Sequence, residues 1–204
     1  MKSPLDILDW STLDAATRDA VLRRPVQRNA ADLLERARSI VTDVRARGDD
    51  ALRDYTSTLD GVHLESFGVS DAEFAAAEAA LTPVQRAALE RAIDTITRFH
   101  ELQTLPPLRL ETAPGVVCER MTVALESVGL YVPAGTAPLP STALMLAVPA
   151  SIAGCPVRVM FTPPRPDGSA DPAVLVAARL CGVRKVFKVG GAQAVAAMAY
   201  GTAT

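Results

Sequence analysis

The chain has 204 residues, of which 49% are hydrophobic and 22% are charged, the balance of an ordinary globular protein with a buried core. Its 21 basic and 23 acidic residues give a net charge of −2, and no basic run or basic-aromatic patch is present, so we expect no nucleic-acid partner. The amino terminus lacks the apolar run of a signal peptide. The longest apolar stretch, residues 143–153, is shorter than the about 20 residues that span a bilayer. We therefore expect a cytoplasmic protein with no membrane partner.

The first part of the chain, residues 1–127, is expected to be a helical segment that ends in a β-rich connector. Asn29 can cap a first helix that Gly48 ends, while Ser70 and Thr82 each begin a capping box. Pro106 and Pro107 follow the last of these helices and stop it. The predicted helices cover about residues 30–48, 70–81 and 82–103, and the predicted strands cover residues 108–112 and 116–125.

From residue 128 to residue 204 the pattern changes to alternating strands and helices. Strands are predicted over residues 128–132, 157–162 and 183–189, with helices over about 141–153, 173–181 and 191–201. Helix crossovers at this spacing imply a parallel sheet covered by helices. The fold class is therefore α/β: an N-terminal helical segment followed by an incomplete, Rossmann-like parallel sheet.

A parallel sheet of three strands leaves two long edges of unpaired backbone groups, which native proteins seldom tolerate. Doubly wound sheets usually have about five or six strands. The chain stops at Thr204, just after a helix, where a further strand would begin. We therefore expect the sheet to be incomplete and the unit to be truncated.

Two loops follow predicted strands and are therefore expected at the ligand-binding edge of the sheet. The first covers residues 129–138 and the second covers residues 190–193. Both contain small residues that allow close backbone approach, and both lead into a helix whose free N–H groups suit a phosphate. Gln193 adds an amide that can form hydrogen bonds. Neither loop matches GxGxxG, and both can also be read as tight turns with helix caps.

Five stretches of sequence, taken in order and spacing, resemble the histidinol dehydrogenase family. They are VGLYVP at 128–133, PSTALM at 140–145, TPP at 162–164, GGAQA at 190–194 and AYGT at 199–202. Shorter matches before residue 104 extend the resemblance over essentially the whole chain. The resemblance implies oxidation of L-histidinol to L-histidine through the aldehyde, the last steps of histidine biosynthesis. It also implies dependence on NAD and zinc, an aldehyde-dehydrogenase-like fold and a homodimer.

The same resemblance identifies Tyr131 and Gln193 as cofactor-binding positions. Ala134 departs from the family pattern, because a glycine usually stands there. The family's third NAD contact, its Glu-His general-base pair and its zinc ligands are implied beyond Thr204. We therefore expect no catalytic and no metal-binding residue in this chain. The chain would supply only the cofactor platform, the part of the protein on which NAD lies. It would be inactive alone.

The remaining candidates for chemistry have simpler interpretations. The histidines, His63 and His100, lie far apart without a neighbouring ligand cluster, so we expect surface or packing roles. The cysteines, Cys118, Cys155 and Cys181, show no CxxC spacing and are expected to be reduced, small buried hydrophobes. Two alternatives remain: a sibling dehydrogenase that acts on another small alcohol, and an inactive truncated product that binds a nucleotide weakly.

Overall fold

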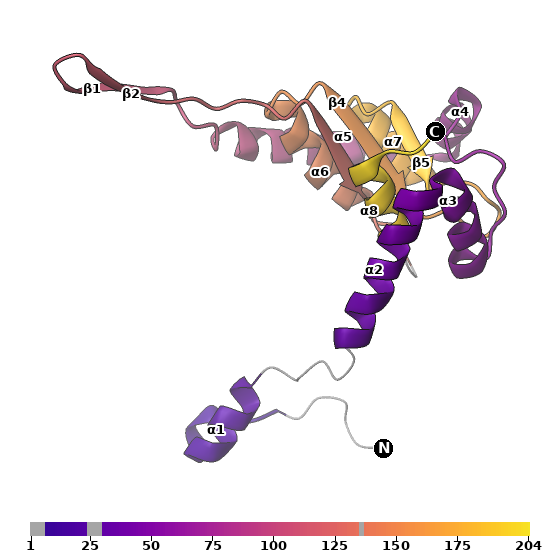
Figure 1. The fold of residues 1–204 in the computed structure, drawn as a ribbon, viewed down its shortest axis with the longest axis horizontal. Coiled ribbons are helices and arrows are strands. Elements are labelled where there is room, and N and C mark those ends of the chain that lie inside the picture. The colour runs from indigo at the N-terminus through magenta and orange to yellow at the C-terminus, as the bar shows by residue number, and fades with distance from the viewer. Residues whose placement is uncertain (1–6, 24–29, 135–136) are drawn as a thin grey trace. The chain divides into compact units, whose positions relative to one another are not determined.

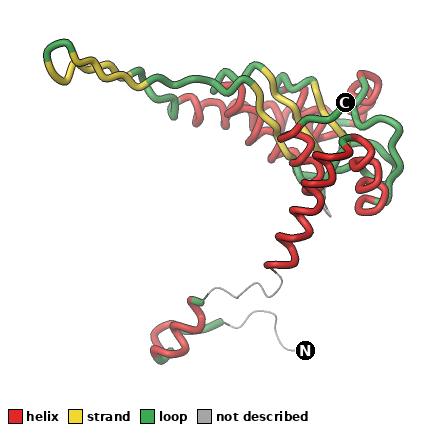
Figure 2. Tube along the Cα trace, in the orientation of Figure 1, coloured by secondary structure: helices red, strands yellow, loops and turns green. Residues whose placement is uncertain are grey.

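The computed structural model describes residues 7–23, 30–134 and 137–204. The contacts within the chain divide it into two compact units, Met1–Arg36 and Ala37–Thr204. The first unit contains η1 (Trp10–Thr12), α1 (Ala15–Leu22) and the beginning of α2 (Ala30–Arg47), as Figures 1 and 2 show. Asn29, the cap predicted for α2, lies outside the described residues.

In the second unit, four helical elements lie between α2 and the sheet. These helices are α3 (Asp49–Tyr55), the π-helical turn η2 (Thr56–Asp60), α4 (Asp71–Ala80) and α5 (Pro83–Glu101). The predicted capping boxes at Ser70 and Thr82 are both formed, each side chain accepting from the backbone N–H three residues later. Among the described helices, none is long and apolar enough to cross a membrane.

Strands β1 (Leu108–Ala113) and β2 (Val116–Arg120) form an antiparallel hairpin. The prediction of a strand as far as residue 125 is wrong, because β2 ends at Arg120. Every residue of both strands is exposed, and no other described element lies beside the hairpin in Figures 1 and 2. An isolated two-stranded hairpin is only marginally stable. Because no third strand or apolar face among the described elements packs against it, the residues after Arg120 do not continue the pairing.

The predicted parallel sheet is present. Its strands, in the order β3-β4-β5, are β3 (Ser127–Tyr131), β4 (Val157–Thr162) and β5 (Lys185–Lys188), and each pair is parallel. They are followed in turn by α6 (Pro140–Ile152), α7 (Pro172–Leu180) and α8 (Gly191–Tyr200). Ser141 does not begin α6 as predicted, because Pro140 already occupies the first helical position, where its missing N–H costs nothing.

The two faces of the sheet belong to two apolar cores. Leu130, Met160 and Val186 form a paired row on one face and pack in a core that includes residues of α4, α6 and α7. The next row, Tyr131, Phe161 and Phe187, faces the other core, which includes residues of α2, α3 and α8. Helices therefore cover both faces, as the strand alternation predicted.

One edge of the sheet is covered by a segment that comes from far earlier in the chain. Gly68 bridges Phe187 in antiparallel fashion, and the N–H of Val69 donates to the carbonyl of Val186 at 2.9 Å. The expectation of two open edges is therefore wrong for β5. Among the described residues, no strand pairs with the outer edge of β3.

The predicted domains, residues 1–127 and 128–204, share a core across their boundary. Phe74 and Ala77 of α4 are buried in the same cluster as Leu130 of β3, and α5 contacts α6. The contacts of the chain divide it between Arg36 and Ala37 instead. A boundary near residue 128 stays a prediction.

Candidate functional site

The carboxyl ends of the three parallel strands meet at one edge of the sheet. The last strand residues are Tyr131 of β3, Thr162 of β4 and Lys188 of β5, and β5 leads directly into the turn at Gly190 and Gly191 that begins α8. Ligands of open α/β sheets bind outside this edge. Both site residues predicted from the sequence belong to it.

Tyr131 connects the end of β3 to the first turn of α8. Its hydroxyl oxygen accepts a hydrogen bond from the backbone N–H of Gly191 at 3.0 Å. The N-cap residue of α8, Gly190, has no side chain that can do this. The tyrosine hydroxyl therefore satisfies one of the N–H groups that the beginning of a helix leaves free.

Gln193 folds back over the same turn. Only 1% of the residue is exposed, and its Oε1 lies 2.5 Å from the position that a Cβ on Gly191 would take. Gly191 also has a φ of 62°, a left-handed conformation that side chains disfavour. The backbone conformation therefore favours glycine at residue 191, and a Cβ there would also force the Gln193 side chain to move. Tyr131 and Gln193, 62 residues apart in number (193 − 131), converge on Gly191.

Several polar atoms at this edge are buried without a partner among the described residues. They are Thr162 Oγ1, Gln193 Oε1 and Asp60 Oδ2, three of the six such atoms in the described part of the chain. Each such atom costs free energy unless something satisfies it. The concentration of unsatisfied oxygens around the Gly190–Gly191 turn is typical of a site that a ligand with hydrogen-bond donors completes.

Lys188 and Glu73 form a partly buried ion pair that the sequence did not reveal. The Lys188 Nζ lies 2.7 Å from the Glu73 Oε1, and the Glu73 Oε2 accepts from the backbone and the hydroxyl of Ser70. Burial by itself would raise the pKa of Glu73, but the hydrogen bonds from Lys188 and Ser70 outweigh it and hold this pKa below the ordinary value. The sequence feature that could have indicated this pair is the lysine at the end of a short strand that is otherwise partly apolar.

The first predicted loop is described only in part, because residues 135 and 136 lie outside the described residues. Ala134, which departs from the family pattern, is partly buried. The residue that precedes α6, Leu139, makes no side-chain capping bond. The N–H groups at the beginning of α6 therefore gain nothing from a side-chain cap there.

The described residues contain no group of three or more His, Cys, Asp and Glu side chains that could hold a metal ion. His63 is exposed with its Nε2 3.4 Å from the Ser57 Oγ, and the His100 Nδ1 lies 2.7 Å from the Gln103 Oε1. The surface or packing roles of the two histidines stay a prediction.

All three cysteines are free. The prediction that they are buried is wrong for Cys118, which is exposed because the β1–β2 hairpin packs against no core. Cys155 is buried, and burial raises the pKa of the Cys181 thiol to about 11. Neither of these two thiols is therefore poised as a nucleophile.

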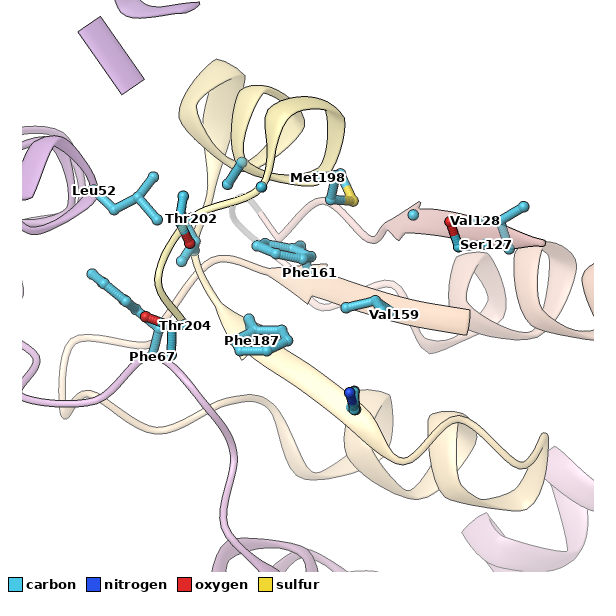
Figure 3. Close-up of a pocket in the computed structure, with 15 residues that line it drawn as sticks. Leu52, Phe67, Ser127, Val128, Val159, Phe161, Phe187, Met198, Thr202 and Thr204 are labelled. Carbon is cyan, nitrogen blue, oxygen red and sulfur yellow. The ribbon is translucent and has the colours of Figure 1, made fainter. Parts of the chain in front are cut away.

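A hollow of about 300 Å³ opens on the α8 face of the sheet, shown in Figure 3. The rings of Phe161 and Phe187 stack at its floor with centroids 5.1 Å apart, and Met198 lines it from α8. Ser127 and Lys185, which also line it, are the first residues of their strands. The hollow therefore reaches to the amino end of the sheet and includes neither Tyr131 nor Gln193.

The chain is similar throughout its length to known proteins. A family model described as Histidinol dehydrogenase matches residues 22–204. Histidinol dehydrogenase of Xanthomonas euvesicatoria pv. vesicatoria is 60% identical over 198 residues, which are 97% of this chain and 46% of the relative. That of Xylella fastidiosa is 53% identical over 200 residues, 98% of this chain and 46% of the relative.

A solved structure agrees with these relatives. The crystal structure of histidinol dehydrogenase from Elizabethkingia anophelis is 37% identical and superposes with a TM-score of 0.87, covering 94% of this chain and 44% of that chain. The chain thus spans less than half the length of the relatives that it matches.

Proposed function

Since the chain belongs to the histidinol dehydrogenase family, we propose that it forms the cofactor platform of an NAD-dependent oxidoreductase that converts L-histidinol to L-histidine. The observation that carries this proposal is the convergence of Tyr131 and Gln193 on Gly191 at the carboxyl edge of a parallel sheet. This is the place where such sheets bind nucleotides. The residues come from two separate loops, and both match cofactor positions implied by the family resemblance.

The residues present at this edge fit a dinucleotide. Gly190 and Gly191 bring no side chain of their own to the beginning of α8, and the positive end of the α8 dipole favours a phosphate. The orphaned oxygens of Thr162 and Gln193 can accept hydrogen bonds from ligand amides or hydroxyls. For this contact the Gln193 side chain must swing out from over Gly191, because it is almost wholly buried. When bound, NAD would accept the hydride that leaves the alcohol carbon.

The role of this chain is therefore to bind and orient. Tyr131 holds the first turn of α8 against β3, so the free N–H groups of the helix point out of the sheet edge. Lys188 and Glu73 anchor the end of β5 on the other side of the turn. A rigid turn lets the dinucleotide lie in one position, which favours hydride transfer by orientation.

Zinc does not fit the described residues, which provide no cluster of ligands. The zinc ligands and the general base stay predicted in the part of the relatives that this chain does not span. The homodimer, the likeness of the overall fold to aldehyde dehydrogenases and the cytoplasmic location also stay predictions.

The proposal is tested by titrating NADH into the purified chain and measuring the fluorescence of the bound nucleotide. We expect saturable binding to the wild-type chain. Tyr131→Phe removes one hydrogen-bonding hydroxyl and Gln193→Leu removes one amide of similar size. Each loss should weaken binding by about 2- to 10-fold, because a net hydrogen bond contributes about 0.5 to 1.5 kcal/mol.

Tyr200→Phe is the matched control, because it removes the same hydroxyl from the exposed far end of α8. It should bind NADH like the wild-type chain. Absence of saturable binding to the wild-type chain, or equal weakening by all three substitutions, would overturn the proposed function.

A further inference from the structure

Asp60 is a carboxylate that approaches the candidate site from a distant part of the sequence. It is the last residue of η2, after which Gly61 turns the chain. Its Oδ1 lies 3.3 Å from the position that a Cβ on Gly190 would take, and the same position lies 2.9 Å from Pro163 Cγ. Pro163 directly follows the last residue of β4. Asp60 therefore lies at the carboxyl edge, between the ends of β4 and β5.

This carboxylate has no evident structural role. The Oδ2 atom is buried and has no hydrogen-bond partner among the described residues. Burial raises the pKa of Asp60 above the ordinary value, with no compensating hydrogen bond or cation. Lys188, a cation at the same end of β5, already forms an ion pair with Glu73. A carboxylate held in this way costs stability and therefore calls for a functional explanation.

The other acids of the sheet region are already engaged. Between residues 127 and 204 the acids are Asp167 and Asp171. Asp167 accepts from the backbone and hydroxyl of Ser169, and Asp171 accepts from the first N–H groups of α7. Asp60, supplied from η2, is thus the carboxylate that remains available to a ligand beside the Gly190 turn.

Nucleotide-binding units of this architecture place an acidic residue after the second strand of the unit, where it hydrogen-bonds the ribose 2′-hydroxyl of NAD. In this chain the second strand is β4, and the residues after it are Pro163 and Pro164, which have no acid to offer. Asp60 and Pro163 both approach the position that a Cβ on Gly190 would take, so Asp60 brings a carboxylate to the end of β4 from another segment.

We propose that Asp60 accepts hydrogen bonds from the adenine-ribose hydroxyls of the dinucleotide and thereby selects NAD over its 2′-phosphorylated counterpart. The inference rests on the proposed function, because it requires the dinucleotide to lie over the Gly190–Gly191 turn. A 2′-phosphate would place its negative charge beside this carboxylate, and no cation of the described residues acts on Asp60 to offset the repulsion. The hydroxyl of NAD instead donates to an oxygen that lacks a partner.

The test compares the dissociation constants of NADH and NADPH, measured by nucleotide fluorescence, for the full 204-residue chain. The wild-type chain should bind NADPH about tenfold more weakly than NADH, since the 2′-phosphate would bring a like charge beside the half-buried Asp60 carboxylate. In Asp60→Asn, NADH should bind more weakly and NADPH more tightly, so that the ratio of the two constants approaches one. Asp94→Asn removes one negative charge from exposed α5 and should leave both constants unchanged.

Asp60→Asn should fold, because it removes a buried charge without a partner, and its melting temperature should equal or exceed that of the wild-type chain. Asp60→Ser provides a second variant that also leaves room for a phosphate and should lose discrimination in the same way. NADH binding with an unchanged NADPH/NADH ratio in both variants would overturn this inference alone. Failure of the wild-type chain to bind NADH would overturn the proposed function, and this inference with it.

Discussion

Glu73 shows how one side chain serves both local and long-range structure. One carboxylate oxygen closes the capping box of α4 with Ser70, and the other receives Lys188 from β5. The lysine is only 7% exposed, so the pair lies where water screens it little. Removing one partner leaves a buried charge, which typically costs about 3 to 5 kcal/mol.

We expect this pair to make the stability of the protein depend on pH in the acid range. The folded-state pKa of Glu73 lies below its ordinary value of 4.5, so the stabilisation is present above about pH 4.5 and is lost as the pH falls through the folded-state pKa. Urea unfolding at several pH values should show a steeper acid loss of unfolding free energy in the wild-type chain than in Glu73→Gln. Glu90→Gln, which removes an exposed partner of Arg86, should keep the wild-type slope. Equal slopes in all three proteins would contradict the assignment.

At the scale of elements, the contact between β3 and α8 determines where the Gly191 turn lies. A Cβ on Gly129 of β3 would stand 2.4 Å from Met198 Sδ and 3.0 Å from Met198 Cβ. The strand and the helix are therefore as close as a glycine allows. This close approach lets Tyr131, two residues further along β3, reach the N–H of Gly191.

Gly129→Ala should therefore push α8 away from the sheet. We expect a loss of about 1 to 3 kcal/mol of unfolding free energy from overpacking and weaker NADH binding, because the Tyr131 contact is strained. Gly68→Ala is the matched control, since a Cβ there meets nothing closer than 3.9 Å and should change stability little. Chemical denaturation measures the first effect and NADH fluorescence the second. A Gly129→Ala protein as stable as the Gly68→Ala protein would show that α8 can shift freely.

At the scale of the whole molecule, few groups of the described residues at the carboxyl edge of the sheet could move a proton. The acids beside the sheet edge are used for turns and caps, apart from Asp60, and neither histidine belongs to a strand-end loop. Oxidation of an alcohol needs a base within hydrogen-bond reach of the hydroxyl. Binding a nucleotide without such a base leaves the barrier to hydride transfer nearly unchanged.

We therefore predict that the 204-residue chain does not oxidise L-histidinol when NAD and zinc are supplied. The measurement is NADH formation by absorbance, with a full-length histidinol dehydrogenase from Xanthomonas as the positive control. Turnover above the background without enzyme would contradict the prediction. If that turnover disappeared in His100→Ala, His100 would be the missing base.

The sequence by itself determined the features that depend on near neighbours. The capping boxes at Ser70 and Thr82 join residues three apart, and the alternation of β-branched runs with capped helices requires parallel strands whose loops meet at one edge. That rule, with the family resemblance, was enough to predict the elements of the sheet and to bring Tyr131 and Gln193 together.

Only the tertiary structure decided which distant segments complete that edge. Lys188 reaches Glu73 across 115 residues, Gly68 pairs with β5, and Asp60 arrives beside Gly190 from η2. These contacts depend on how the helices before the sheet pack on it, and no local spacing encodes that packing. The tertiary structure likewise decided that Cys118 is exposed. Burial of a strand residue depends on whether another element covers the strand, and the sequence pattern of the strand does not show this.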